Sequence, residues 1–435
     1  MKFFLKPFLF FVVFFIFAPV LCAKPNVLPI EINARKINEG LDLTQSETSL
    51  WARIRHGFAM QDIDDELTTK YQNLYENNPA YLKRMVARAK PFLHRIVEEI
   101  EKRNLPTELA LLPMVESAFN PKAYSRAKAS GLWQFIPSTG KRFRLEQNYF
   151  VDERRDVLAS TEAALEYLQN IYDLHGDWHL ALASYNWGEG AVGRAIRKNE
   201  HQDLASDYLS LKMPNETRHY VPKLQALKNI FGNPFLLERL GIEDIPNRSY
   251  VASVQLKDSI SVQTAAALAG LSEDELLKFN PAHNRALMFA NTELLLPEDK
   301  IDEFEENLEN FEGPLHNLWV IQLKTASTLS DFAKKHHLSL EKLAQTNGLN
   351  PKSSLKAGSA LLVPQSVAGA QNLDDFVAEH GMPEMLEKKV AQKRKWQKRK
   401  KPSAKRVKKK TKSKKSVSKS SKKSVSKTIK KSNSK

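Results

Sequence analysis

Apolar residues between positions 50 and 235 recur with the spacing of α-helices. Leu50, Ile54 and Phe58 form one stripe at i, i+4 and i+8, and Ile96 and Ile100 belong to a later one. Such a stripe allows a helix to bury one face against a core. The pattern predicts a helix-rich domain over 50–236, with helical segments inside 51–103 and at 159–174 and 180–198.

The C-terminal half of the chain differs because it contains an internal repeat. Residues 254–257 (VQLK) match residues 321–324 (IQLK), and the same offset of 67 aligns Asn280 with Asn347. Each unit predicts a strand, two helices and a second strand, which make a small α+β module of the βααβ type. We expect modules at 248–298 and 317–365, with the acidic segment 302–317 between them as a linker or short helix.

Glu116 lies in an apolar helical stretch. Leu109, Leu112, Glu116 and Phe119 stand at i, i+3, i+7 and i+10, so the carboxylate falls within the apolar stripe of a helix that we expect to end near 120–121, at a proline. A charge in this setting either finds partners or has its pKa raised until it holds a proton near neutrality. Two interpretations stay open: a structural Glu paired with an Arg, and a functional acid.

The loop after this helix is rich in Ser, Ala and Lys. Residues 131–134 (GLWQ) and 137–140 (PSTG) predict backbone turns that hold an aromatic ring and an amide close to the preceding helix. A sugar has apolar faces for stacking and hydroxyl groups for hydrogen bonds. A mixed aromatic and amide surface here is therefore suited to binding a sugar.

Two further features lie between this loop and the repeat. Gly188 and Gly190 interrupt an otherwise helical pattern, and because a glycine there destabilises a helix by about 1 kcal/mol relative to alanine, we expect a packing or close-approach reason. Glu216 and Tyr220 stand at i and i+4 and are expected to share one helix face.

The positive charge of the chain is concentrated at its C-terminal end. The net charge is +16, but residues 388–435 alone hold 24 Lys and Arg and no Asp or Glu, so the rest of the chain is net acidic. A Lys- and Ser-rich segment with almost no apolar residue is expected to be disordered. This basic tail either solubilises the chain or binds an anionic envelope polymer by charge. It lacks the interleaved aromatic residues of a single-strand binder, so no nucleic acid is expected as a partner.

The first 23 residues have the features of an export signal. Lys2 and Lys6 precede an apolar run at 8–20, and a plausible cleavage site lies at 21–23. No later stretch is apolar and long enough to span a membrane, so we expect an exported protein of the periplasm or cell envelope, with an irregular lead-in at 24–49. Cys22 is the single cysteine, and it lies at the signal junction. Attachment to a membrane, with an outer-membrane association, is expected only if Cys22 is lipidated.

Two other patterns partly match metal and nucleotide sites but lack features that those sites need. His175 and His179 have the i, i+4 spacing of a zinc pair, but Gly176 and the lack of a general-base Glu between them favour surface histidines. The glycines at 188, 190 and 193 lack the Lys-Ser/Thr and the preceding strand of a phosphate-binding loop. No metal, nucleotide or other cofactor is expected.

Four separated motifs resemble those of the lytic murein transglycosylases of bacterial cell-wall turnover, in particular their membrane-bound D type. They are Glu116-Ser117 with Phe119-Asn120-Pro121, Gly131-Leu132-Trp133-Gln134, Ala183 with Tyr185-Asn186, and Glu216-Thr217-Arg218 with Tyr220. The resemblance implies a mainly α, lysozyme-like catalytic domain. The two repeat units resemble LysM modules, which bind glycans containing N-acetylglucosamine. The second is the better match and the first is degenerate.

The resemblance also implies a reaction that uses one carboxyl group. Hydrolysing glycosidases generally need two. Here Glu116 would protonate the oxygen between N-acetylmuramic acid and N-acetylglucosamine, and the substrate's N-acetyl group would stabilise C1. Glu116 would then take the proton of the C6 hydroxyl, which closes a 1,6-anhydro ring without consuming water. The implied substrate-binding residues are Ser125, Gln134, Tyr185, Asn186, Glu216 and Tyr220, whereas Arg218 is expected to anchor structure.

A second function stays open beside the enzyme. A lysozyme-like domain without activity, joined to two LysM-like modules, would make a peptidoglycan-binding wall protein. Both interpretations have peptidoglycan glycan strands as the partner, and they differ in whether the strands are cleaved.

Overall fold

The computed structural model describes residues 47–368 and 376–379 of the 435-residue chain. The expectations for the export signal, Cys22, most of the lead-in and the basic tail fall outside these residues. Within the two described ranges, no helix is both long and apolar enough to cross a membrane.

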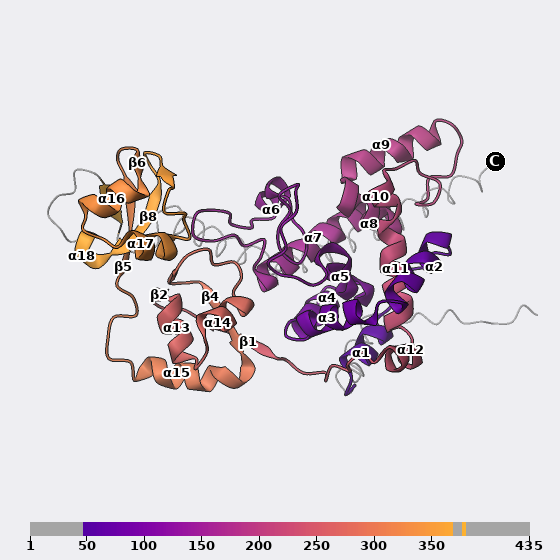
Figure 1. The fold of residues 1–435 in the computed structure, drawn as a ribbon. Helices are drawn as coiled ribbons and strands as arrows, with labels where there is room; N and C mark the ends of the chain where they lie inside the picture. Colours follow the sequence, from indigo (N-terminus) through magenta and orange to yellow (C-terminus); the bar gives the residue numbers. More distant parts are fainter. Residues whose placement is uncertain (1–46, 369–375, 380–435) are drawn as a thin grey trace, which may run out of the picture. The chain divides into compact units, whose positions relative to one another are not determined.

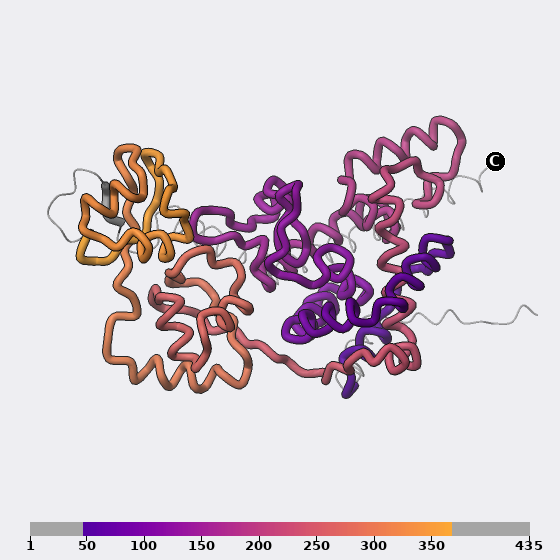
Figure 2. Tube along the Cα trace, viewed as in Figure 1, coloured from indigo at the N-terminus to yellow at the C-terminus, as the bar shows by residue number. Residues whose placement is uncertain are grey.

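Between residues 47 and 240 of the described chain, the regular structure is helical, as the apolar spacing predicts (Figure 1). The Cα trace follows this part of the chain in indigo to pink (Figure 2). The bounds are α1 (Leu50–His56), α2 (Glu66–Glu76), α3 (Pro79–Ala89), α4 (Leu93–Glu101), η2 (Thr107–Leu111), α5 (Leu112–Ser117), α6 (Pro137–Arg142), α7 (Val157–His175), α8 (Trp178–Trp187), α9 (Glu189–Glu200), α10 (Asn215–Arg218), α11 (Tyr220–Phe231) and α12 (Pro234–Leu240).

Capping residues explain where the long helices begin and end. The side chain of Asp156 accepts a hydrogen bond from the N–H of Ala159 at the start of α7, and Asp177 does the same for Leu180 at the start of α8. Between the two, Gly176 ends α7 with a φ of +67°, a left-handed conformation that favours glycine. The chain therefore turns sharply here, and α7 packs against α8.

Helix α11 forms the buried centre of the helical domain. Most of its residues are buried, and it packs against α2, α5 and α8. Near its C-terminal end, the ring of Phe231 lies 4.4 Å from the ring of Trp51, centroid to centroid. The first residue of this helix is Tyr220, so the packing of the core fixes the position of the Tyr220 side chain.

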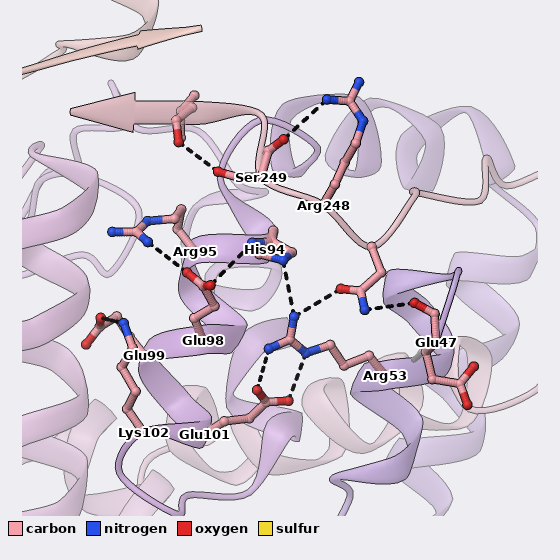
Figure 3. Close-up of polar contacts among 12 residues, drawn as sticks. Glu47, Arg53, His94, Arg95, Glu98, Glu99, Glu101, Lys102, Arg248 and Ser249 are labelled. Carbon is pink, nitrogen blue, oxygen red and sulfur yellow. Dashed lines mark hydrogen bonds and ion pairs between the residues drawn. The ribbon is translucent and has the colours of Figure 1, made fainter. Parts of the chain in front are cut away.

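A buried polar cluster links α1 and α4 to the segment that leaves the helical domain (Figure 3). Arg53 is only 4% exposed and donates hydrogen bonds to both carboxylate oxygens of Glu101, at 3.1 and 2.6 Å, and to Oδ1 of Asn247 at 3.0 Å. His94 lies 3.2 Å from the same guanidinium, and burial lowers the pKa of its imidazole. A buried guanidinium is stable only with such partners. The cluster thereby fastens the chain at Asn247.

The internal repeat folds into two modules with the predicted order of strand, helix, helix and strand (Figure 1). The first has β1 (Val251–Gln255), β2 (Ile260–Ser261), α13 (Val262–Leu268), α14 (Glu273–Phe279), β3 (Leu287–Met288) and β4 (Glu293–Pro297). Between the modules lie η3 (Glu298–Lys300) and α15 (Ile301–Glu309), and α15 covers the first part of the acidic segment. The second has β5 (Leu318–Leu323), β6 (Ser327–Thr328), α16 (Leu329–Lys335), α17 (Leu340–Asn347), β7 (Ser354–Leu355) and β8 (Ala360–Pro364), followed by α18 (Gln365–Ala368) and β9 (Phe376–Glu379).

The two modules are stabilised by the same side-chain-to-backbone contact. In each, the outer strands pair antiparallel, β1 with β4 and β5 with β8. The aligned residues Asn280 and Asn347 are buried, and each exchanges two hydrogen bonds with the backbone of a strand residue, Leu295 in the first module and Leu362 in the second. One amide side chain therefore ties the second helix to the last strand in both repeats, which explains why both repeats carry Asn at this position.

The loop between α6 and α7 makes hydrogen bonds to both modules. The N–H of Asp152 donates to the carbonyl of Ala282 at 2.9 Å, and the N–H of Asn284 donates to the carbonyl of Phe150 at 2.8 Å. The hydroxyl of Tyr149 donates to the side chain of Asn347 at 2.9 Å. This loop, residues 146–155, is thus in contact with each repeat.

Candidate active site

The backbone places Glu116 in the last turn of a short helix. The expected continuous helix is instead a 3-10 turn, η2, followed by α5, and α5 ends at Ser117, before the predicted position near 120–121. Ala118 and Phe119 have φ values of +50° and +57°, and their N–H groups bond back to the carbonyls of Met114 and Pro113. This left-handed ending satisfies carbonyls that the helix would leave free. The proline therefore does not set the helix end.

The Glu116 side chain is half-buried and bonded to Tyr220. The Tyr220 hydroxyl donates a hydrogen bond to Oε1 of Glu116. Burial raises the pKa of Glu116 to about 7, and the negative charge of Glu216 acts in the same direction. The bond from Tyr220 and the positive charge of Lys223 act against this rise. The carboxyl group is therefore neither fully protonated nor fully ionised near neutral pH, and the alternative of a Glu paired with an Arg is not what the structure contains.

Tyr185 approaches the same carboxyl group from α8. Its hydroxyl donates to the backbone carbonyl of Trp133 at 2.9 Å. Burial holds the pKa of Tyr185 well above its usual range, and the nearby charge of Glu116 adds to the effect. Tyr185 is thus a neutral hydrogen-bond donor that joins the helical core to the loop after α5.

Asn186 follows Tyr185 at the end of α8 and fastens a different element. Its Oδ1 accepts a hydrogen bond from the hydroxyl of Thr217 in α10 at 2.8 Å. Directly after it, Gly188 separates α8 from α9 with a φ of +95°, and a Cβ atom there would meet nothing within 4 Å. The expected packing reason for Gly188 is therefore wrong; the glycine is needed for its backbone conformation.

The loop at 122–135 is held by its own polar groups. Oγ of Ser125 accepts from the N–H of Ala129 at 3.0 Å, and Nε2 of Gln134 donates to the carbonyl of Gly131 at 2.7 Å. A Cβ atom on Gly131 would lie 1.8 Å from the carbonyl oxygen of Arg154, so only glycine fits. Ser125 and Gln134 both remain half-buried.

The aromatic ring expected for sugar stacking does not come from Trp133. That side chain is fully buried, and its Nε1 donates to the hydroxyl of Thr161 at 2.9 Å. Trp133 is therefore part of the core, and its large apolar ring is better placed there than on a wet surface. The exposed aromatic residue of this loop is Tyr124, which is 65% exposed.

Glu216 and Tyr220 lie on two separate helices and not on one continuous face. α10 ends at Arg218 and α11 begins at Tyr220, with His219 between them. Glu216 is exposed, whereas Tyr220 is buried. Both still act on Glu116, Tyr220 through its hydroxyl and Glu216 through its charge. Arg218 donates to the carbonyl of Tyr208 at 3.2 Å, a contact within the scaffold.

Three residues near this site have no counterpart in the sequence expectations. Lys223, one turn after Tyr220, is a positive charge that acts on Glu116. Its ammonium group lies 5.4 Å from the ring centre of Tyr71, and the hydroxyl of Tyr71 is 2.7 Å from Nδ1 of His219. The i, i+3 spacing from Tyr220 could have indicated Lys223. No local sequence pattern indicates that Tyr71 of α2 lies beside α11.

The histidine pair has ordinary partners. His175 bonds through Nε2 to the hydroxyl of Ser184 at 2.9 Å, and His179 bonds to the carbonyl of Gln61 at 3.0 Å. Among the residues that the structure describes, no group of three His, Cys, Asp or Glu side chains is arranged to hold a metal ion.

Tyr220 from α11 and Tyr185 from α8 lie near one carboxyl group that can hold and release a proton near pH 7. Ser125 and Gln134 lie on the loop at 122–135 and bond to the backbone of that loop. A carboxyl group with this pKa is suited to act as a general acid and then as a general base at neutral pH. The raised pKa near 6 of the lysozyme acid is a known case of the same effect.

Comparisons with known proteins show which families and relatives the chain matches. Residues 96–207 match the transglycosylase SLT domain, residues 250–313 match the LysM-like domain of lytic transglycosylase MltD, and residues 322–364 match the LysM domain. The chain is 35% identical over 348 residues to membrane-bound lytic murein transglycosylase D of Escherichia coli strain K12, with 76% of this chain and 75% of the relative covered.

Two further similarities concern shorter parts of the chain. Membrane-bound lytic murein transglycosylase C of Glaesserella parasuis is 26% identical over 210 residues, covering 41% of this chain and 58% of the relative. A solved structure of lytic transglycosylase Slt from Pseudomonas aeruginosa aligns at 22% identity with a TM-score of 0.28, over 45% of this chain and 33% of that one.

Proposed function

The chain belongs to the lytic murein transglycosylase family, and we propose that Glu116 is the single acid/base group with which it cleaves peptidoglycan. It is a peptidoglycan lytic transglycosylase. As a carbon-oxygen lyase, it cleaves the β-1,4 bond between N-acetylmuramic acid and N-acetylglucosamine. The observation that carries the assignment of Glu116 is its half-buried carboxyl group, with a pKa of about 7 and a bond from Tyr220.

The proposed reaction moves one proton twice. Protonated Glu116 donates its proton to the glycosidic oxygen, so the bond from that oxygen to C1 of N-acetylmuramic acid breaks and the N-acetylglucosamine part leaves as an alcohol. The substrate's own N-acetyl group stabilises C1. The Glu116 carboxylate then removes the proton of the C6 hydroxyl, and the C6 oxygen bonds to C1. The product is a 1,6-anhydro end, and Glu116 is protonated again.

The hydrogen bond from Tyr220 supports this proposal because it engages one of the two carboxyl oxygens of Glu116. Because its hydroxyl donates to Oε1 of Glu116, the proton that goes to the substrate is carried on the other oxygen. The same bond stabilises the ionised form that is needed in the second step. We assign Tyr220 the role of holding the carboxyl group in one orientation.

The remaining site residues are proposed to bind the substrate. Tyr185 and Glu216 act electrostatically on Glu116 or are affected by its charge, which supports their nearness to the reacting bond. Ser125 and Gln134 are proposed to contact the N-acetyl and hydroxyl groups of the sugar from the 122–135 loop. Asn186 is assigned to the same cleft, and its bond to Thr217 fixes its amide for that purpose.

We assign to the modules and the chain ends roles in holding the protein at the cell envelope. We assign glycan binding to the second module, which matches the LysM domain, and hold the first module, matched to a LysM-like domain, as a weaker glycan binder. A relative named membrane-bound supports action at the cell envelope. Export to the periplasm by residues 1–23 follows as a proposal, as does adhesion of the tail at 388–435 to an anionic envelope polymer. Mass spectrometry of the mature N-terminus decides whether Cys22 is removed or lipidated.

Digestion of purified sacculi tests the assignment. The full chain is expected to release 1,6-anhydro-muropeptides, and Glu116→Gln is expected to release none while still binding the sacculi. A chain that binds sacculi, loses this binding when residues 248–365 are deleted, and releases no soluble product as wild type is an inactive wall protein. That result would overturn the enzymatic assignment.

A further inference from the structure

A cavity lies between the turn from α7 to α8, the segment after α1 and the start of η2. Its volume is about 430 Å³, within the range of about 300–1,000 Å³ that is typical of small-ligand sites. Its lining includes Gln61, Asn104, Gln169, Tyr172, Asp177 and Trp178. Neither Glu116 nor any other residue that we assign to the reaction lines this cavity.

The cavity is separate from the site around Glu116. Trp178 is the first residue of α8, and Tyr185, which approaches Glu116, lies seven residues further along the same helix. At 1.5 Å per residue, about 10 Å of helix lies between the two. Asn104 likewise precedes η2, whereas Glu116 lies in the last turn of α5. A ligand in the cavity therefore leaves the active site open to another stretch of substrate.

Two stacked aromatic rings form one wall of the cavity. The ring centres of Tyr172 and Trp178 are 4.4 Å apart with 19° between the ring planes, and both side chains pack partly buried against the helical core. Tyr172 lies in the last turn of α7, so the turn at Gly176 brings the two rings together. The stacking and the core fix the rings, which therefore offer an apolar contact to a ligand at little cost in side-chain entropy.

Three carboxamide side chains belong to the same lining. Gln61 and Asn104 are exposed, so their amide groups are accessible to a ligand. Gln169 donates to Oδ1 of Asp173 at 2.8 Å, which leaves its own carbonyl oxygen as an acceptor. Asp177 uses one carboxylate oxygen to cap α8 and has a second oxygen that accepts hydrogen bonds.

The lining selects a neutral ligand. None of the described residues that line it is Lys or Arg, and charge-assisted bonds to an anion need such donors. His179 also lines the cavity, but its Nε2 bonds to the carbonyl of Gln61 at 3.0 Å. The fitting ligand has an apolar face for the rings and hydroxyl groups, which both donate and accept, for the carboxamides. A saccharide has both features.

A proline-rich peptide fits the same lining less well. Aromatic-lined grooves also bind such peptides, but proline has no N–H group, so the peptide offers mainly carbonyl acceptors. It leaves the carbonyl oxygens of Gln61, Asn104 and Gln169 without a donor. The three carboxamides therefore favour a saccharide.

We propose that this cavity is a second saccharide site, which holds one stretch of glycan while Glu116 acts on another. The stacked rings pack on the sugar, and the three carboxamides bond to its hydroxyl groups. The inference rests on the proposed function, because peptidoglycan glycan strands are the saccharide that this enzyme meets. The helical domain then contacts its substrate at two places, independently of the modules.

The indole N–H of Trp178 reports directly on this cavity. The full chain with Glu116→Gln, which does not cleave the probe, is labelled with nitrogen-15 in its six tryptophans, and the Trp178 signal is identified by its absence in Trp178→Phe. Titration with tetra-N-acetylchitotetraose is expected to shift this signal saturably. The signals of Trp51 and Trp133, which are fully buried in the core, are expected to stay in place and serve as internal controls.

Variants of the carboxamides test the contacts without disturbing the ring pair. Gln61→Ala and Gln169→Ala are each expected to weaken the binding measured at Trp178 by about 2- to 10-fold, the effect of one lost hydrogen bond. Asn170→Ala, beside Gln169 but outside the lining, is the matched control and is expected to bind as wild type does. The melting temperature of each variant is measured in parallel and is expected to stay near the wild-type value. An unmoved Trp178 signal, unchanged affinity in both variants, or an equally strong shift with decaproline would overturn the proposal.

A cleavage assay separates this inference from the proposed function. Holding the insoluble sacculus raises the local concentration of cleavable bonds, whereas a soluble tetrasaccharide gains nothing from being tethered. The ratio of the rate on sacculi to the rate on the tetrasaccharide is therefore expected to fall several-fold in the double variant Gln61→Ala/Gln169→Ala and to stay at the wild-type value in Asn170→Ala. Anhydro products with an unmoved Trp178 signal and an unchanged ratio would refute the cavity assignment alone. A shifted Trp178 signal with no anhydro product from the wild-type chain would refute the proposed function alone.

Discussion

Tyr220 donates its phenolic hydrogen to Oε1 of Glu116, a bond between side chains 104 residues apart in the sequence. It joins the first residue of the largely buried helix α11 to the last turn of α5. The core thereby holds the orientation of a carboxyl group that is itself half-buried, and the proposed reacting group is positioned without being placed on a flexible loop.

Replacing Tyr220 with Phe removes this bond and changes the pH dependence of cleavage. The bond lowers the pKa of Glu116, so the variant has a higher pKa than the wild-type value of about 7. Since the first step needs protonated Glu116, activity falls as the pH rises through this pKa, and the falling limb of kcat/KM is expected to move to higher pH. The rate at the optimum is expected to drop about tenfold through lost orientation. Tyr250→Phe, outside the site, is the control; an unshifted limb in Tyr220→Phe would contradict this role.

Two charges of opposite sign are expected to move the same limb in opposite directions. Glu216→Gln removes a negative charge that raises the pKa of Glu116, so the limb moves to lower pH. Lys223→Gln removes a positive charge that lowers this pKa, so the limb moves to higher pH. Both shifts are expected to shrink at 1 M salt, because Glu216 is exposed and Lys223 is partly exposed to solvent. pH–rate profiles at two ionic strengths measure them, with exposed Glu238→Gln as the control. Shifts of one sign for both variants would refute the electrostatic account.

Glu116 is also expected to reduce stability at high pH. Its folded-state pKa, about 7, lies above the ordinary value of 4.5. The folded chain therefore binds this proton more tightly, and the stabilisation is complete below pH 4.5 and lost as the pH rises through 7. Glu116→Gln lacks this loss and is expected to be more stable than wild type at pH 8 by up to about 3 kcal/mol, with little difference at pH 4.5. Urea unfolding at the two pH values measures both; equal differences at both would show that burial does not govern this carboxyl group.

Glu108 is a buried carboxylate that bonds to the backbone and to a lysine of the helical core. It is 1% exposed, accepts from the N–H groups of Ala59 and Met60 at 3.0 and 2.9 Å, and pairs with Nζ of Lys228 at 3.1 Å. Glu108→Ala leaves two N–H groups without this acceptor, whereas Lys228 keeps Asp62 as a partner at 2.8 Å, and the change is expected to destabilise the fold by about 2–4 kcal/mol.

The control for this change is another Glu–Lys pair at the surface. Glu243, with its side chain 54% exposed, pairs with Lys90, and Glu243→Ala is expected to change the free energy of unfolding by less than about 1 kcal/mol. Similar losses in Glu108→Ala and Glu243→Ala would mean that Glu108 is not a structural anchor.

The sequence predicts the elements of this protein better than their contacts. The helical period and the repeat predict the helices and the two βααβ modules because burial imposes a pattern on neighbouring residues. The nearness of Glu116 and Tyr220, and the action of Lys223 on the same carboxyl group, depend on how α5 packs on α11, which leaves no local signal. Only the resemblance to a known family points to Tyr220.

Two local expectations fail for identifiable reasons. The helix that carries Glu116 ends at Ser117 because Ala118 adopts a left-handed conformation, which its residue type does not favour. The guanidinium of Arg88 donates to the carbonyl of Ala118 at 3.2 Å, so a tertiary contact supports this turn. Trp133 is buried although its motif lies in a loop, because its ring fills the core beneath that loop. In both cases packing against distant residues outweighs the local pattern.

The most direct test of the central claim is digestion of sacculi in water enriched in oxygen-18, followed by mass spectrometry of the muramic acid ends. If Glu116 serves as the single acid/base and the C6 hydroxyl closes the ring, the ends are 1,6-anhydro and carry no heavy oxygen. Reducing ends that carry one oxygen-18 atom would show that water attacks C1, and they would contradict the account.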